Sequence, residues 1–460
     1  MKENYIKRVE LKGIHNRYDL EIDFNESLNI LYGKNGTGKS TLIHIIANIA
    51  NCDFIRFAFL KFISIKVIYS NDAHVCLTQV DENNEDLVII ETDSGAKCFF
   101  GKIEAFETFE TLNLLTDDRY SREHEPALIK KLAQFVKENN IRHIETSYFP
   151  AFRTMLEAWS SQRENNRMLP RRVRDIYLNR ITNFSRELFG EFLPDINYPS
   201  PIEIERSLRN EIRDQQIRVA RYESSVFSDS FVKVFSALLE GKNIDVNADH
   251  LLQEISQLTA ESTSSKLGDL EENSNAYREL QALVNKSATH GDLKSASGAL
   301  AVYRDALKER QSFQQNAFKE IDTYFEVVNS FLDKKELSYS LDKNKRIPRV
   351  GLKFPDGTWS PIRVMSSGER QLLTMLYAVT RMSRNSAVLI DEPEISLHID
   401  WQEDLLEKMM KQLGNRQIIV CTHSPAIAAD FDEYMKEVSP IFISSSKNDS
   451  DFLSNEEDDF

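Results

Sequence analysis

A glycine-rich segment near the N-terminus carries the residue types that hold phosphate groups. Residues 33–40 read Gly-Lys-Asn-Gly-Thr-Gly-Lys-Ser and fit the phosphate-loop pattern, between a strand-like run and a helix-compatible run. Glycines let backbone N–H groups turn toward phosphate oxygens, and the helix start adds partial positive charge. We expect Lys39 to reach the β- and γ-phosphates and the Ser40 hydroxyl to ligate Mg²⁺. The predicted nucleotide-binding residues of this segment are Gly33, Asn35, Gly36, Gly38, Lys39, Ser40 and Thr41.

Two acidic residues farther along the chain have the chemistry that would complete such a site. Asp391 and Glu392 directly follow the apolar run 388–390. In phosphate-loop enzymes an Asp at this place holds Mg²⁺, and a neighbouring Glu can orient and deprotonate the attacking water. An acidic pair after a strand is also common in exposed loops. The functional interpretation of this pair therefore depends on the other motifs in the chain.

The segment 365–371, Met-Ser-Ser-Gly-Glu-Arg-Gln, precedes that run and is predicted to open a helix. It resembles the LSGGQ signature of ABC-type ATPases, with Ser367 at the place of the first glycine and Glu369 at the place of the glutamine. The SSGE form is similar to the RecF, Rad50 and OLD members of that family. The resemblance implies that this helix start caps the γ-phosphate bound by a partner subunit. The implied capping residues are Ser366, Ser367, Gly368 and Glu369.

Two further segments resemble motifs of the same family. Residues 393–398 are similar to the D-loop at the dimer interface, with His398 where the family has Asp. Residues 422–425 resemble the switch loop, which implies that His423 contacts the γ-phosphate. Tyr18 is the candidate for the aromatic residue that contacts adenine, and a surface strand tyrosine is an equal alternative.

The resemblance as a whole implies a homodimer that uses ATP and Mg²⁺ as its cofactors. The implied catalytic residues are Lys39, Glu392 and His423, and the implied metal ligands are Ser40 and Asp391.

The elements around these motifs predict an α/β fold. We expect an ABC-type P-loop ATPase head, a mixed sheet with flanking helices, interrupted by a large α-helical insertion. Apolar alternation over 5–32 and again near the signature predicts strands, whereas charged stretches with helical spacing predict helices between them. The expected domains are a first half of the head at 1–118, a mainly helical insertion at 119–336, a second half of the head at 337–445, and an acidic disordered tail at 446–460.

Charge and composition narrow the classes of function. The chain has 57 Lys and Arg and 72 Asp and Glu, a net charge of −15, which disfavours nucleic-acid binding over the whole surface but not at a local patch. Its four cysteines are widely spaced, as in reduced cytosolic proteins. The N-terminus lacks the apolar core of a signal peptide, and charges interrupt the most apolar stretch, 54–69. We therefore expect a cytoplasmic protein without a membrane span.

Two arginine-containing segments have two interpretations each. An arginine cluster around Tyr177 could track the phosphates of DNA or RNA, or form a solvated face that pairs with nearby acids. Residues 148–153 resemble a Pro/Arg segment of bacterial ATPases, in which Arg153 would contact phosphate or an interface, or would simply start a helix. The cluster consists of Arg163, Arg167, Arg171, Arg172, Arg174 and Arg180.

The long segment between the phosphate loop and the signature distinguishes this chain from transporter ATPases, which have a short helical subdomain there. The stretch after His423 is too short for an OLD-type nuclease domain, so we expect nuclease activity in a partner. The first hypothesis is an ATPase subunit of bacterial antiviral defence, similar to the Septu ATPases that work with an HNH-type nuclease. The alternatives are a RecF-like DNA-repair ATPase and a nucleotide sensor that assembles a scaffold without turnover. A transporter subunit fits these features least. The sequence does not decide whether the protein forms an oligomer larger than a dimer.

Overall fold

The chain forms two compact units, which we call the head unit (Met1–Tyr198 and Ala378–Phe460) and the helical unit (Pro199–Tyr377). The boundaries expected at 118/119 and 336/337 differ from the boundaries of these units. The arginine cluster at 163–180 and the acidic tail at 446–460 lie outside the described residues. The computed structural model describes residues 5–82, 85–115, 126–141, 144–153, 155–156, 181–196, 198–239, 250–251, 253–258, 297–341, 348–381, 386–412 and 416–443.

A five-stranded parallel sheet, in the order β14-β3-β13-β12-β8, lies at the centre of the head unit. The strands are β3 (Leu28–Tyr32), β8 (Glu145–Phe149), β12 (Ser386–Asp391), β13 (Gln417–Cys421) and β14 (Met435–Glu437). Every residue of β13 is buried, as expected for a parallel strand that is covered on both faces. Because the strands run in one direction, the loops that follow them meet at one edge of the sheet.

A second, seven-stranded sheet of the head unit has the order β15-β2-β1-β4-β5-β6-β7, and all its neighbouring pairs are antiparallel. Burial alternates along β4, as expected for a sheet with one covered face. The strands are β1 (Ile6–Ile14), β2 (Tyr18–Asp23), β4 (Ser64–Tyr69), β5 (His74–Glu82), β6 (Glu85–Thr92), β7 (Lys97–Gly101) and β15 (Ile441–Phe442).

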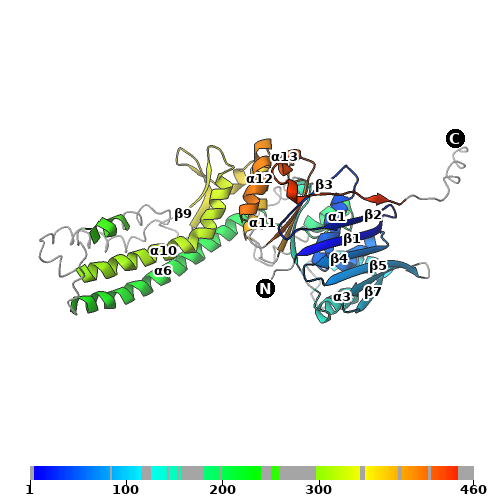
Figure 1. Cartoon of the computed structure of the whole chain (residues 1–460), viewed down its shortest axis with the longest axis horizontal. Coiled ribbons are helices and arrows are strands. Elements are labelled where there is room, and N and C mark those ends of the chain that lie inside the picture. Colours follow the sequence, from blue (N-terminus) through cyan, green and yellow to red (C-terminus); the bar gives the residue numbers. More distant parts are fainter. Residues whose placement is uncertain are drawn as a thin grey trace, which may run out of the picture. The chain divides into compact units, whose positions relative to one another are not determined.

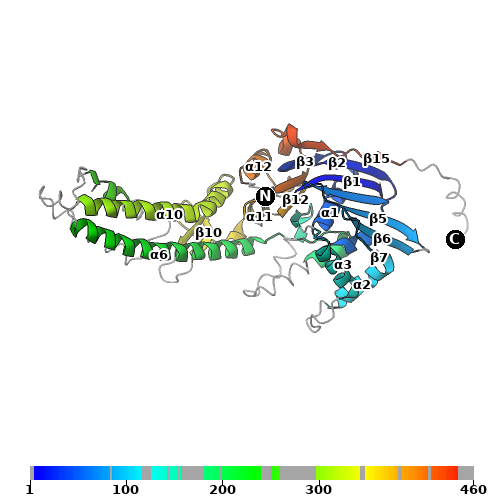
Figure 2. The same ribbon diagram turned by 60° about the horizontal axis from the view of Figure 1, so that its bottom comes forward.

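Helices cover both sheets of the head unit (Figures 1 and 2). Helix α1 (Lys39–Ala50) packs against β8, β12 and β13, whereas the 3-10 helix η1 (Phe54–Phe59), α2 (Lys102–Leu115) and α3 (Ala127–Glu138) contact the seven-stranded sheet or one another. One apolar cluster joins α1 to both sheets, and it includes Ile45, Val67 and Ile419. The C-terminal part adds α12 (Ile399–Gln412), α13 (Pro425–Ala428) and η4 (Asp432–Tyr434).

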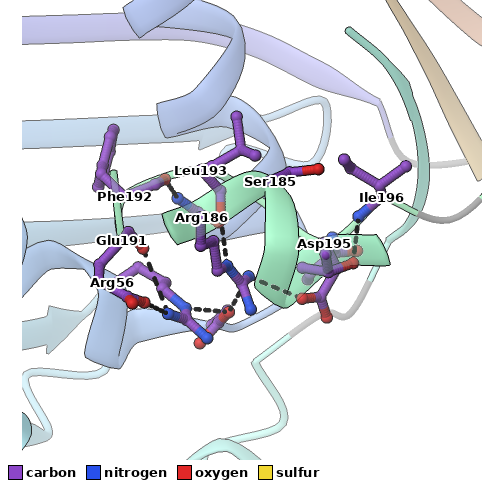
Figure 3. A network of polar contacts seen from close by, with 12 residues as sticks. Arg56, Ser185, Arg186, Glu191, Phe192, Leu193, Asp195 and Ile196 are labelled. Carbon is purple, nitrogen blue, oxygen red and sulfur yellow. Dashed lines mark hydrogen bonds and ion pairs between the residues drawn. The ribbon is translucent and has the colours of Figure 1, made fainter. Parts of the chain in front are cut away.

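Two buried arginines hold the segment 181–196 beside η1 (Figure 3). Arg56 of η1 donates a hydrogen bond of 2.9 Å to the carboxylate of Glu191. Arg186 donates one of 2.7 Å to the carboxylate of Asp195 within the segment and lies 3.7 Å from the carboxylate of Asp53, the residue before η1. Each buried cation is therefore paired with an acid, which offsets the desolvation of its charge. The segment is thereby held within the head unit by contacts of its own.

The helical unit contains two long helices, α6 (Pro201–Leu239) and α10 (Ser297–Asn329), which lie side by side (Figures 1 and 2). Tyr222 of α6 stacks on Phe313 of α10, with ring centroids 3.8 Å apart. The unit also contains a three-stranded sheet, β11-β10-β9, in which the turn at Gly357 joins β10 to β11. The other elements are β9 (Glu336–Leu341), β10 (Pro348–Lys353), β11 (Trp359–Ser360), η3 (Ile362–Val364) and α11 (Ser367–Arg381).

The predicted fold class is confirmed: an α/β fold with flanking helices and a large helical insertion. One local difference stands out. Strand β8 lies within the segment expected to be mainly helical, yet it pairs with β12 in the central sheet of the head unit. The apolar stretch 54–69 forms η1 and β4. Within the described part of the chain, none of the helices has the length and apolarity that crossing a bilayer requires.

Candidate nucleotide-binding site

A pocket of about 930 Å³ lies at the carboxyl edge of the parallel sheet, where the loops after β3, β12 and β13 meet. It brings the phosphate loop together with the acidic pair and the switch histidine, both of which lie hundreds of residues farther along the chain. Its lining residues all belong to the head unit. They are His15, Arg17, Tyr18, Asn35, Gly36, Gly38, Lys39, Ser40, Thr41, Asp391, Glu392, His423 and Phe442.

The phosphate loop has a backbone that requires glycine. Gly36 and Gly38 have φ angles of 80° and 88°, in the left-handed region that glycine adopts without strain. A Cβ atom on Gly38 would also come within 2.3 Å of the Tyr18 hydroxyl oxygen. The Lys39 ammonium donates hydrogen bonds of 2.9 and 3.0 Å to the carbonyls of Gly33 and Lys34. Because an ammonium has three donors, this arrangement holds the amine over the loop and keeps one N–H for a phosphate oxygen.

The side chains of Ser40 and Asp391 lie together at the inner end of the pocket. The Ser40 hydroxyl forms a hydrogen bond with the buried Asp391 carboxylate. Burial raises the pKa of Asp391 to about 6; the Ser40 hydrogen bond opposes this shift and the nearby charge of Glu392 adds to it. A carboxylate beside a hydroxyl is an oxygen donor pair that suits Mg²⁺.

The described residues contain no cluster of three or more His, Cys, Asp or Glu side chains that could hold a metal ion. Mg²⁺ needs six oxygen ligands and usually takes several of them from water and from substrate phosphates. The two protein oxygens at Ser40 and Asp391 therefore fit a metal that arrives with a phosphorylated substrate.

Glu392 has an unusual backbone. Its φ angle is 50°, in the left-handed region that is uncommon for a residue with a side chain. Two hydrogen bonds hold it there: its N–H donates to the Cys421 carbonyl at 2.9 Å, and its carbonyl accepts from Arg153 at 2.9 Å. Strained conformations of this kind persist only where the surroundings impose them.

Arg153 follows β8 and is only 1% exposed. Its guanidinium donates to five main-chain carbonyls, at distances from 2.9 to 3.4 Å. These carbonyls belong to Pro150, Asp391, Glu392, Pro393 and Ile395. Arg153 is the first residue of a helical segment, as the second interpretation predicted, and its buried side chain also holds the backbone of the acidic pair and the D-loop in place.

The side chain of Glu394 joins the D-loop to the switch loop through hydrogen bonds. The Glu394 carboxylate accepts hydrogen bonds from the backbone N–H groups of His423 at 2.8 Å and Ser424 at 3.1 Å. Its other oxygen accepts the Thr422 hydroxyl at 2.9 Å. The His423 side chain itself lines the pocket. His398, which stands at the usual Asp position of the D-loop, is exposed and lies 3.3 Å from Asp400.

The signature residues Ser366 to Glu369 begin α11, in the helical unit, where they form a capping box. The Ser366 N–H donates to the Glu369 carboxylate at 2.7 Å, and the Glu369 N–H approaches the Ser366 hydroxyl at 3.4 Å. The Lys335 ammonium lies 2.9 Å from the same carboxylate. Burial opposes ionisation of Glu369, yet the bonds from Lys335 and Ser366 keep its pKa below the ordinary value. The capping box leaves the N–H groups of Ser367 and Gly368 as the donors at this helix start.

The pocket is also lined by Tyr18, which the sequence analysis named, and by His15, Arg17 and Phe442, which it did not name. Tyr18 is only 5% exposed, and its hydroxyl end lies against Gly38. His15 and Arg17 come from the β1–β2 turn. Phe442 comes from the two-residue strand β15, and a segment so short gives no sequence signal for its pairing with β2.

The comparisons with known proteins agree with this class of site. The family described as AAA ATPase domain (AAA_15) matches residues 5–428, and the chain belongs to that family.

One relative is the Escherichia coli protein "Retron Ec83 probable ATPase", which is 28% identical over 254 residues. The match covers 51% of this chain and 44% of that protein, so the chain spans less than half of its length. Among solved structures, the Smc head domain of Pyrococcus furiosus, bound to the C-terminal domain of ScpA, has a TM-score of 0.39 at 14% identity over 96% of both chains. An Smc head bound to the C-winged helix domain of ScpA has a TM-score of 0.36 at 12% identity, over 95% of this chain and 97% of that one.

Proposed function

We propose that this chain binds and hydrolyses ATP with Mg²⁺, in a homodimer that closes on two nucleotides. The observation that carries the proposal is the single pocket to which the sheet edge brings Lys39, Ser40, Asp391, Glu392 and His423. These are the side-chain types that phosphoryl transfer requires: a cation for the phosphates, oxygen ligands for the metal and a base for water.

Each residue then has a distinct part in the reaction. Lys39 binds the β- and γ-phosphates with its remaining N–H, and Ser40 and Asp391 hold Mg²⁺, which neutralises phosphate charge when bound. Glu392 orients and deprotonates the attacking water, and the backbone strain at this residue fixes the direction of its side chain. His423 contacts the γ-phosphate. The N–H groups of Ser367 and Gly368 from the partner subunit cap the same phosphate.

We further propose that this ATPase is a cytoplasmic subunit that regulates a partner nuclease of the HNH type in bacterial antiviral defence, as Septu ATPases do. Its similarity to an ATPase of a bacterial retron supports a role beside other components rather than in transport.

Native mass spectrometry of the protein, expressed with its neighbouring genes, tests both parts of the proposal. A complex with a nuclease, together with an ATP-dependent dimer that Lys39→Ala abolishes, is the expected result. If ATP produces no dimer and calorimetry shows equal ATP affinity for Lys39→Ala, the ATPase proposal fails. A bare ATP-dependent dimer that binds duplex ends would overturn the nuclease part and favour the DNA-repair alternative.

A further inference from the structure

We propose that Phe442, on the C-terminal edge strand β15, is the residue against which the nucleobase of ATP stacks, and that Arg17 faces the base from the β1–β2 turn. This inference rests on the proposed ATP function and adds the part of the site that selects the base.

The pocket has two ends with different chemistry. Asp391, Glu392 and His423 line the end where the metal and the γ-phosphate belong. At the other end Tyr18 touches Gly38, and Phe442 touches Tyr18. A nucleotide whose phosphates lie on Lys39 therefore extends toward Phe442 with its remaining part, which is the nucleoside.

The Phe442 side chain is exposed where it lines the pocket, whereas the Tyr18 side chain is buried. Tyr18 is 5% exposed, and any side chain on Gly38 would collide with its phenol. Phe442 is 65% exposed and meets Tyr18 edge to face, with centroids 6.3 Å apart and planes at 65°. Every nucleobase has a flat π-face that stacks well on such a ring. We therefore assign the contact with the base, which the sequence analysis expected of Tyr18, to Phe442, which packs on Tyr18.

The backbone holds Phe442 at this place. It pairs with Tyr18 in the antiparallel ladder between β15 and β2, and the N–H of Ile443 donates to the Arg17 carbonyl at 2.8 Å. The β1–β2 turn and β15 therefore form one wall.

The exposed neighbours of Phe442 do not extend the same patch. Ile441 and Ile443 are also exposed, which by itself would suit a protein-docking strip. Successive side chains of a strand point to opposite faces, so these two isoleucines face away from the side on which Phe442 lies. Among these three residues only Phe442 lines the pocket.

Arg17 suits the same ligand. Its guanidinium is planar, always charged and weakly hydrated, so it can stack on a base or bind the ribose and α-phosphate. Burial and the charge of Arg17 lower the pKa of the neighbouring His15, which leaves a neutral imidazole beside the guanidinium.

Calorimetry of the full chain with ATP, UTP and inorganic tripolyphosphate tests the inference. Phe442→Ala should weaken ATP binding about tenfold, weaken UTP binding less, and leave tripolyphosphate affinity unchanged, because only the base loses its contact. Phe442→Trp should restore the ATP affinity, and ATP but not tripolyphosphate should quench the added tryptophan emission. Phe99→Ala is the matched control, since Phe99 is 59% exposed on the same sheet and lies outside this pocket.

The inference is overturned if Phe442→Ala binds ATP as tightly as the native chain does. It is also overturned if this substitution weakens the affinities for ATP and for tripolyphosphate equally. These outcomes leave the ATPase proposal intact as long as Lys39→Ala abolishes binding. If the native chain binds neither ATP nor tripolyphosphate, both proposals fail together.

Discussion

The Arg153 guanidinium donates a hydrogen bond of 2.9 Å to the main-chain carbonyl of Glu392, whose φ angle is 50°. The bond joins the end of β8 to the end of β12, across 239 residues of sequence. A buried cation beside three acids and five carbonyls balances local charge and fixes the backbone of the proposed general base. Arg153 is thus a positioning residue that need not touch the substrate.

We predict that Arg153→Lys lowers kcat for ATP hydrolysis by about 100-fold, because a lysine cannot span five carbonyls and Glu392 will shift. The dissociation constant for ATP should change little, since Lys39 and the phosphate loop remain. Steady-state kinetics and calorimetry separate the two quantities. Arg56→Lys, a buried arginine outside the pocket, should lower Tm without this loss of kcat. Equal losses in kcat and affinity would show that Arg153 is only structural.

We predict that Glu392→Gln slows ATP hydrolysis by about 100-fold or more, because an amide cannot accept the proton of water. ATP should still bind and should trap a closed dimer that size-exclusion chromatography detects. Glu403→Gln, an exposed residue of α12, should behave as the native protein. Normal turnover by Glu392→Gln would remove this residue from its proposed role.

We predict that Glu394→Gln lowers kcat about tenfold, because an amide has one acceptor oxygen where the carboxylate uses two for Thr422, His423 and Ser424. If Glu394 acts by placing His423, the double variant with His423→Ala should be no slower than His423→Ala alone. Additive losses in the measured kcat would mean that the two residues act separately.

We predict that Lys335→Met weakens ATP-dependent dimerisation about tenfold, because it leaves the Glu369 carboxylate uncompensated beside the helix start that we propose caps the partner subunit's γ-phosphate. Adding Glu369→Gln should restore dimerisation, since the charge is then absent. Analytical ultracentrifugation measures the ATP-dependent dimerisation of the single and the double variant. Lys353→Met, which breaks an exposed ion pair of the same unit with Glu336, should have no effect. A double variant as weak as Lys335→Met would refute the charge argument.

We predict that the free energy of unfolding falls between pH 6.5 and about pH 4 through His44. Burial lowers the pKa of His44 to about 4, and its ring lies 2.8 Å from the Tyr148 hydroxyl. Above pH 6.5 the imidazole is neutral in both states and has no effect. Below pH 6.5 His44 binds a proton in the unfolded chain but not in the folded chain. The free energy of unfolding therefore falls, by about 3 kcal/mol at most.

Urea unfolding at several pH values checks this prediction. His44→Gln keeps a polar partner for Tyr148 but does not titrate, so its stability should depend less on pH in this window. An unchanged slope in His44→Gln would show that other groups cause the loss.

The site could be predicted from the sequence wherever its chemistry lies in one short segment. The phosphate loop at 33–40, the pair at Asp391 and Glu392, and the serine–glutamate capping box of α11 are such segments. Their glycines, acids and caps impose the local backbone directly, and the apolar patterns of the chain predict the α/β class with a helical insertion.

Only the tertiary structure decided which distant residues serve that chemistry. Strand β8 lies in a helix-rich stretch and joins the central sheet through pairing with β12, which no local pattern encodes. Arg153, Glu394 and Phe442 acquire their roles from partners brought close by strand order. A side chain's burial, charge balance and ring exposure depend on those partners, so they are properties of the folded chain rather than of any motif within it.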